Sequence, residues 1–262
     1  MNDEGGNGVP LPFEGFYSRP QLSRWLDAMP RRFSCRNFSA PADISGLAAA
    51  EYAAARVCLK GIRIAVVHQG AENLVVSVPL FPRFIGLKQY AVILAKSGTG
   101  QAGLLAGISG EAFQLELAAL HLQGCWITGN YRRITAAQAA REEEKVMAVM
   151  PFGVPADPDG ARLSRRKILT AFSPDDPTLW PYWAYRAADA MRSAPSAVNR
   201  QPWRVSYSGN TLSFTGSKLD SIDSGIAVMH LECALSDRRH AWRLAADSRT
   251  LLVQVEENDE PV

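Results

Sequence analysis

The sequence predicts an α+β protein in which antiparallel sheets are packed by helices. Three observations indicate this class: helix and strand patterns alternate along the chain, two long apolar segments have helical character, and residues 203–216 have the pattern of a hairpin. In that hairpin, β-branched and aromatic residues flank a Gly-Asn pair that suits a tight turn. The 262 residues are 47% hydrophobic and 21% charged, which is typical of a globular chain with a substantial core.

The first part of the chain supplies helices and strands in turn. The apolar spacing predicts helices over 18–29, 42–59, 108–124 and 135–144, and strands over 62–69, 73–80, 88–96 and 145–153. We expect Ser109 to cap the third helix, and Thr135 with Gln138 to form a capping box at the start of the fourth.

A proline-rich connection, 173–183, is the one good boundary candidate. It divides the chain into a first half, 1–172, and a shortened second half, 173–262. The second half repeats the order of helix, loop, strands and apolar helix, with helices expected over 185–193 and 224–242. Four residues of each half match at one constant offset, which favours an internal duplication: Leu115, Glu116, Ala118 and Trp126 match Leu231, Glu232, Ala234 and Trp242.

Charge and cysteine content exclude several classes of protein. The formal net charge is +2 and no basic block is present, so we expect no nucleic-acid partner. No apolar run approaches the roughly 20 residues of a membrane helix, and the N-terminus has no signal-peptide pattern, so we expect no membrane association. The cysteines are far apart in sequence and form no CxxC, which favours reduced thiols and a cytoplasmic location: Cys35, Cys58, Cys125 and Cys233.

The search for catalytic motifs leaves few candidates. Residues 98–103, GTGQAG, match the glycine pattern of a dinucleotide-binding loop, but Gly107 and Gly110 would break the helix that should follow. We therefore favour a flexible glycine-rich loop. The histidines have no metal-ligand spacing and no expected carboxylate partners, and we predict neither a metal site nor a catalytic triad or acid–base pair. An enzyme without such groups often uses an organic cofactor.

Two basic segments are candidates for a phosphate site. In residues 29–41, MPRRFSCRNFSAP, three arginines surround a serine, and residues 165–167 are Arg-Arg-Lys. Guanidinium groups and a hydroxyl are donors that suit a phosphate. Two such clusters in a chain of near-neutral charge favour a phosphate clamp over two solvated surfaces.

Taken in order, these motifs resemble the FMN-dependent nitroreductase family over most of the chain. RRFSCRNF is similar to the family's N-terminal phosphate motif, and APSAVNRQPW to its Pro-Ser…Asn-x-Gln-Pro-Trp motif, the most specific match. GEAFQLELAALHLQGCWITG is similar to the core helix and the loop after it, and VMPFGVP and RRKIL to the closing strand and terminal basic motif. The resemblance implies a nitroreductase-like α+β fold of two pseudo-symmetric halves, with central antiparallel sheets packed by helices.

One departure from the family pattern is informative. In ordinary members the Pro-Ser…Asn motif follows the arginine motif closely, and two chains pair to build each flavin site. Here that place holds AAARVCLKGIRIAVV, and the motif comes only after the terminal basic motif. The chain therefore resembles the single-chain, pseudo-dimeric, TM nitroreductase-like branch, in which the two halves intertwine and one chain suffices for one FMN.

The resemblance also implies which residues bind the cofactor. The phosphate and ribityl end would be held by Arg32, Phe33, Ser34 and Arg36, together with either Arg165 or Arg166. From the second half, the flavin would be contacted by Pro195, Ser196, Ala197 and Asn199. One flavin edge would meet Trp126, Ile127, Thr128 and Gly129.

The function implied is that of an FMN-dependent NAD(P)H oxidoreductase. In a ping-pong cycle, NADH or NADPH gives hydride to FMN and leaves, and a small electron acceptor such as a nitroaromatic or quinone then enters. Two alternatives stay open: a degenerate flavin-binding protein without turnover, and a dinucleotide-binding protein that uses the GxGxxG loop.

Overall fold

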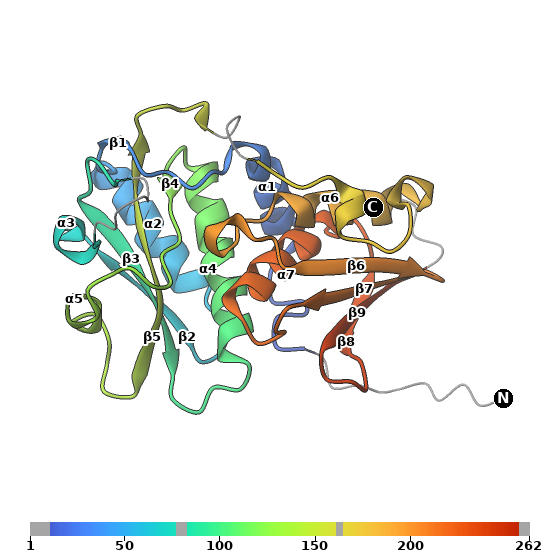
Figure 1. Cartoon of the computed structure of the whole chain (residues 1–262). Helices are drawn as coiled ribbons and strands as arrows, with labels where there is room; N and C mark the ends of the chain where they lie inside the picture. Colours follow the sequence, from blue (N-terminus) through green and yellow to red (C-terminus); the bar gives the residue numbers. More distant parts are fainter. Residues whose placement is uncertain (1–10, 77–82, 161–164, 257–262) are drawn as a thin grey trace.

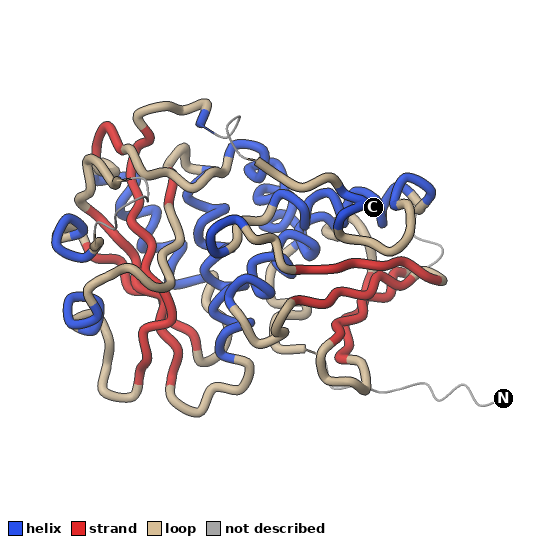
Figure 2. Tube along the Cα trace, viewed as in Figure 1, coloured by secondary structure: helices blue, strands red, loops and turns tan. Residues whose placement is uncertain are grey.

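The computed structural model describes residues 11–76, 83–160 and 165–256, which form two antiparallel sheets with helices between them (Figure 1). The first sheet contains β1 (Phe38–Ala40), β2 (Ile62–Val67), β3 (Gln89–Lys96), β4 (Gln123–Gly124) and β5 (Glu144–Pro155). The second contains β6 (Trp203–Ser208), β7 (Thr211–Gly216), β8 (His240–Leu244) and β9 (Thr250–Val255). The predicted α+β class is confirmed, and Figure 2 shows the helices lying between and around the two groups of strands.

Four strands of each sheet follow the same order, β2-β3-β5-β4 in the first sheet and β6-β7-β9-β8 in the second, and β1 is an additional strand of the first sheet. In the first sheet β2 pairs with β3, β3 with β5, and β5 with both β4 and β1. In the second the order is β6-β7-β9-β8. The continuous apolar run of β3 lies in the middle of its sheet, where Gln89 through Ala95 are all buried. The predicted hairpin is β6 and β7, joined by Gly209 and Asn210 with φ of 48° and 60°, as a type I′ turn requires.

Two apolar helices fill the space between the sheets. The helices are α1 (Arg19–Ala28), α2 (Ile44–Arg56), α3 (Ala71–Leu74), α4 (Ala102–Ala119), α5 (Arg133–Ala137), α6 (Tyr182–Ser193) and α7 (Ile222–Ala234). α4 and α7 cross at the centre of the molecule (Figure 1) and are buried over most of their lengths, as expected of helices that are apolar on every side. Among the residues described, no helix combines the length and apolarity needed to cross a membrane.

α4 and α7 touch through a pair of glycines. A Cβ atom on Gly107 would overlap the carbonyl oxygen of Ile222 and lie 2.8 Å from the Cα of Gly225. A Cβ atom on Gly225 would in turn overlap the carbonyl oxygen of Leu104 and lie 2.8 Å from the Cα of Gly107. This reciprocity is that of a local two-fold contact. It pairs Gly107 with Gly225, whereas the constant offset found in the sequence would pair Gly107 with Asp223.

The glycines therefore do not break the helix, contrary to the sequence-based expectation. α4 begins before them, at Ala102, and Gly110 gives room to the ring of Trp126, which a Cβ atom would overlap. Ser109 is likewise not a cap. It lies inside α4, and its Oγ accepts a hydrogen bond from the backbone N–H of Leu59 at 3.0 Å.

Three further local predictions were wrong. The proposed strand over 73–80 begins within helix α3, and its end lies outside the described residues. The proposed capping box is absent from α5, which is capped at Arg132 so that Thr135 lies inside the helix. The helix proposed over 224–242 ends at Ala234, because the chain then turns into β8.

An ion pair across the edge of the first sheet makes stability sensitive to acid. Glu144 receives hydrogen bonds from Arg63 at 2.7 and 2.5 Å and from the backbone N–H of Arg141 at 2.8 Å. The Arg63 guanidinium is the main reason that the pKa of Glu144 falls from 4.5 to about 2. Because the folded-state pKa is depressed, this contribution to stability is complete above 4.5 and is lost as the pH falls towards 2.

We expect Glu144→Gln to lower stability at neutral pH and to reduce the further loss of stability on acidification. Urea unfolding at pH 7 and at about pH 3.5 measures both effects. Glu142→Gln, at an exposed neighbouring position, serves as the control. A Glu144→Gln variant as acid-sensitive as the parent would contradict the assignment.

Candidate functional site

Three motif segments that are distant in sequence meet at the C-terminus of α6. Arg32 donates from Nη2 to the carbonyl oxygen of Ser193 at 3.0 Å. Arg166 donates to the same oxygen from Nε and Nη2, at 3.2 and 3.0 Å. The last carbonyl groups of a helix lack helical partners and lie at the negative end of its dipole, so guanidinium groups stabilise them. One backbone oxygen thus joins the arginine motif, the second basic segment and the entrance to the Pro-Ser…Asn loop.

The loop after α6 has an unusual backbone. The helix ends at Ala194, whose ψ of 138° is extended, because the following Pro195 disfavours helical geometry. Val198, Asn199 and Gln201 then adopt left-handed conformations with φ of 45°, 55° and 51°. A β-branched residue such as Val198 rarely adopts this conformation, and strain of this kind concentrates at functional sites.

Side-chain hydrogen bonds tie the loop to the second basic segment. Asn199 accepts from Arg166 Nη1 at 2.7 Å through Oδ1 and donates to the carbonyl oxygen of Arg165 at 2.9 Å through Nδ2. Gln201 is buried, and its Oε1 accepts from the backbone N–H of Lys167 at 3.0 Å. The loop and the basic segment therefore hold each other in place.

The other predicted residues of the loop mainly shape its backbone. Pro195 is buried, and Ser196 Oγ accepts from the backbone N–H of Gln201 at 2.8 Å. The backbone N–H of Ala197 donates to the carboxylate of Asp223, in the first turn of α7, at 3.0 Å. Asn199 is exposed and is the residue of this set with a side-chain amide at the surface.

Two guanidinium groups lie close together beneath the loop. Arg32 is 4% exposed, and its Nε lies 3.7 Å from Oε1 of Glu111. Its Nε and Nη1 have no hydrogen-bond partner within the described part of the chain. Burial lowers the pKa of Arg32, and Glu111 opposes that shift. Burial and the charge of Arg32 lower the pKa of Arg166 to about 10, so Arg166 remains cationic at neutral pH.

Sequence reasoning missed the carboxylate at the centre of the site. Glu111 of α4 is fully buried, lies 2.9 Å from His230 Nε2 through Oε1, and accepts from Trp126 Nε1 at 2.9 Å through Oε2. The expectation that no histidine has a carboxylate partner is wrong, because His230, His240 and His68 each contact a glutamate. The signal in the sequence was that Glu111 and His230 are ionisable residues within two apolar helices, where such a group needs a partner.

The remaining residues of the arginine motif run from the interior to the surface. Phe33 is buried, Ser34 is half-buried and Arg36 is exposed, with its Nη1 3.5 Å from the carbonyl oxygen of Ser34. Burial raises the pKa of Cys125, whereas the charges of Arg36 and Arg32 oppose that increase. The charges of both arginines thus act on the same thiol.

The segment Trp126–Gly129 has a fixed base and an exposed tip. Ile127 and Val149 of β5 exchange two backbone hydrogen bonds, each of 2.9 Å. Trp126 is half-buried, whereas Thr128 and Gly129 are exposed. The segment therefore presents Thr128 and Gly129 at the surface, and the carbonyl oxygen of Gly129 accepts from the backbone N–H of Tyr131 at 2.9 Å.

The glycine-rich segment has a different role from that of a dinucleotide-binding loop. Asp220 Oδ1 accepts from the backbone N–H groups of Gly103 and Leu104 at 2.6 and 3.1 Å. These are the donors at the start of α4 that a pyrophosphate would use. A carboxylate of the same chain occupies them, which disfavours the GxGxxG alternative.

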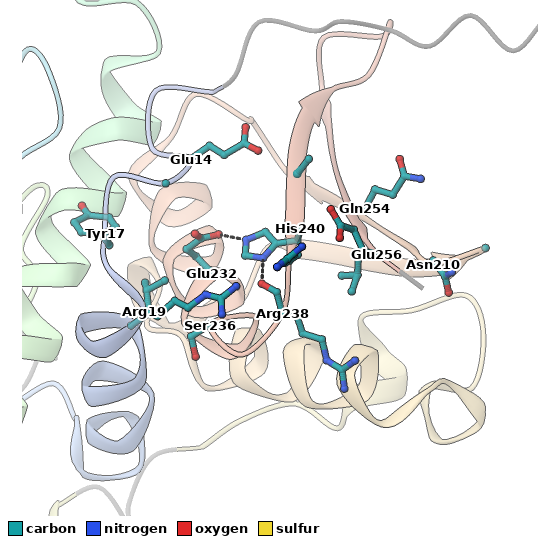
Figure 3. A pocket seen from close by; sticks show the side chains of 16 residues that line it. Glu14, Tyr17, Arg19, Asn210, Glu232, Ser236, Arg238, His240, Gln254 and Glu256 are labelled. Atoms are coloured by element: carbon teal, nitrogen blue, oxygen red, sulfur yellow. Dashed lines mark hydrogen bonds and ion pairs between the residues drawn. The ribbon is translucent and has the colours of Figure 1, made fainter. Parts of the chain in front are cut away.

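Two large cavities in the described part of the chain lie away from these residues. One, of about 790 Å³, lies between the N-terminal segment, the end of α7 and the second sheet, where Glu232 Oε2 and His240 Nε2 are 3.0 Å apart (Figure 3). The other, of about 660 Å³, lies between α2 and β2. The described side chains contain no group of three or more His, Cys, Asp or Glu residues that could hold a metal ion.

The chain belongs to the nitroreductase family whose description is "Putative TM nitroreductase", with residues 25–235 matched. A solved structure from Thermotoga maritima, a "putative nitroreductase", is similar over 97% of this chain and 99% of its own, with 19% identity and a TM-score of 0.60. The FMN-dependent nitroreductase NfnB from Mycobacterium smegmatis, in complex with NADPH, covers 59% of this chain and 99% of its own, with 15% identity and a TM-score of 0.45. No curated protein matches the sequence significantly. The family is one of oxidoreductases, and the nitroreductase fold is confirmed.

Proposed function

We propose that the protein binds FMN and passes hydride from NADH or NADPH through it to a small oxidised acceptor. The single observation that carries the proposal is the convergence of Arg32 and Arg166 on the Ser193 carbonyl oxygen, with Asn199 bonded to Arg166. Family membership supports oxidoreductase chemistry. The convergence supports an anionic ligand that spans both halves of the chain.

The charges and donors of the site fit the phosphate of FMN. Arg32 and Arg166 bring two positive charges close together, and two nitrogen atoms of Arg32 have no hydrogen-bond partner among the described residues. A phosphate near this cluster would reduce the repulsion between the cations. Because Arg32 is enclosed, we propose that exposed Arg36, Arg165 and the hydroxyl of Ser34 hold the outer side of the phosphate, with Arg32 and Arg166 beneath it.

The flavin ring is proposed to lie between the two exposed loops. Asn199 offers an amide from the second half, and Thr128 and Gly129 offer backbone groups from the first. FMN, when bound, would supply the hydride-accepting ring. The chain itself supplies orientation and polar contacts.

We further propose that residues 1–172 and 173–262 are duplicated halves of one pseudo-dimer. The shared strand order and the reciprocal contact of Gly107 with Gly225 support this relation. α2 precedes β2 at the edge of the first sheet, and α6 precedes β6 at the edge of the second, but the two helices end differently. The carbonyl oxygen of Val57 accepts from the hydroxyl of Tyr17 at 2.8 Å, where α6 has two arginines. An aromatic side chain therefore takes the place of a phosphate-binding cluster in the first half.

We accordingly expect one FMN per chain and a chain that is sufficient alone to build the site. The visible spectrum of the purified protein, with protein and released flavin measured on one sample, tests this. Two flavins per chain, or flavin bound only between separate chains, would contradict the pseudo-dimer. Oxidation of NADH or NADPH with a generic quinone acceptor separates a working enzyme from a flavin-binding protein without turnover.

A further inference from the structure

The Glu111–His230 pair has a defined distribution of protons. His230 Nδ1 lies 2.9 Å from the carbonyl oxygen of Ala190, which can only accept, so Nδ1 carries a proton. The hydroxyl of Ser193, 3.0 Å from Nδ1, donates to the same carbonyl oxygen at 2.7 Å and leaves a lone pair for the imidazole. On the opposite side, His230 Nε2 lies 2.9 Å from Glu111 Oε1.

The contact between Nε2 and Glu111 therefore requires one more proton. With Nδ1 already protonated, a neutral imidazole would present a lone pair to a carboxylate oxygen in a fully buried position. The pair avoids this repulsion by holding an additional proton, as imidazolium and carboxylate or as imidazole and carboxylic acid. In either form the pair has no net charge.

Because the Glu111–His230 pair has no net charge, it does not offset the positive charges of Arg32 and Arg166. Arg32 Nε is 3.7 Å from Glu111 Oε1, beyond hydrogen-bond distance, whereas His230 Nε2 is at 2.9 Å from the same atom. Arg166 contacts a carbonyl oxygen and an amide oxygen rather than a carboxylate. The nearby Arg192 is paired with Asp189 at 2.7 Å. The buried cluster thus has the charge of two guanidinium groups.

We infer that His230 is a positioning residue that neutralises Glu111 and so leaves the charges of Arg32 and Arg166 available to a bound phosphate group. The inference rests on the proposed function only in taking FMN as the source of that phosphate. The second half of the chain would then contribute to the site twice, through His230 of α7 and through the exposed Pro-Ser…Asn loop. The second carboxylate oxygen of Glu111 accepts a hydrogen bond from Trp126 Nε1 and so holds the indole ring in place.

We expect the affinity for anions to depend on the net charge of the residues at positions 111 and 230, and not on whether Glu111 and His230 are both present. His230→Gln leaves Glu111 as an unneutralised carboxylate beside Arg32, and we expect affinity for phosphate to fall about tenfold or more. Glu111→Gln can donate to a neutral His230 and still accept from Trp126, so affinity should stay within about threefold of the parent. The double variant is again neutral and should recover the affinity that His230→Gln loses.

Calorimetric titrations with inorganic phosphate and with FMN test this on the full chain. The matched control is His240→Gln, which removes the histidine from the similar Glu232–Trp242 cluster near the end of α7 and should leave both affinities unchanged. Losses of similar size in all three variants of the pair would show a purely structural role and overturn the inference, as would parent affinity in His230→Gln. Phosphate binding with the expected pattern in a protein that takes up no FMN would support the inference and contradict the flavin proposal.

Discussion

Gly107→Ala is expected to destabilise the protein by about 3 kcal/mol or more, a large part of the 5–15 kcal/mol typical of a folded domain. The added methyl group would overlap the carbonyl oxygen of Ile222 and lie 2.8 Å from the Cα of Gly225. Both obstacles are backbone, so no side-chain rotation relieves them and α4 must move away from α7. That movement would open the centre of the core, because both helices are buried along most of their length.

Equilibrium urea unfolding of the variant and the parent measures this effect. Gly100→Ala is the matched control, since a Cβ atom there has open space around it. Gly225→Ala should resemble Gly107→Ala, because its methyl group would overlap the carbonyl oxygen of Leu104. Stability close to that of the parent in either core variant would mean that the two helices do not cross as closely as described.

Arg36→Ala is expected to weaken FMN binding roughly tenfold to a hundredfold. A charge-assisted hydrogen bond to a phosphate contributes about 1.5–3 kcal/mol, which corresponds to that range of affinity. Arg36 is exposed and lies two residues from half-buried Ser34, which suits the proposed contact with the outer side of the phosphate. The loss should diminish at high salt, because an exposed charge is screened.

Quenching of flavin fluorescence in a titration gives the two affinities. Arg31→Ala is the control, as Arg31 belongs to the same segment, is exposed, and donates instead to the carbonyl oxygen of Asp27 at 3.1 Å. Equal affinity of Arg36→Ala and the parent would refute the phosphate assignment. An equal loss in both variants would indicate a diffuse effect of positive charge rather than a specific contact.

Elements with a strong local pattern could be predicted from the sequence. The apolar run of β3 and the Gly-Asn turn of the hairpin determine their own conformations, and both were placed correctly. The start of α4 was predicted wrongly, because Gly107 and Gly110 serve tertiary contacts that the local sequence does not reveal. Gly107 faces α7 and Gly110 faces the ring of Trp126. Helix propensity considers only the local sequence and therefore treats both glycines as helix breakers.

In the site, too, residues with a local sequence motif could be predicted and residues that depend on tertiary contacts could not. Motifs placed Arg166 and Asn199 on the list of candidates, and the structure brings these two side chains within 2.7 Å. Glu111 and His230 carry no motif and lie in different halves of the chain, so only the crossing of α4 and α7 makes them partners. The arginine caps of α6 also escaped prediction, since the group that they bind, the Ser193 carbonyl oxygen, belongs to the backbone and has no sequence pattern.

The two halves share a core that does not depend on the connection between them. One core cluster contains residues of both halves, from Phe13 in the first to Val255 in the second. Phe172, at the end of the first half, packs on Trp203 with ring centroids 6.4 Å apart and accepts from the backbone N–H of Val205 at 2.9 Å. If the peptide chain were cut after this point, the two fragments would be expected to stay associated and behave as the unlike subunits of an obligate heterodimer.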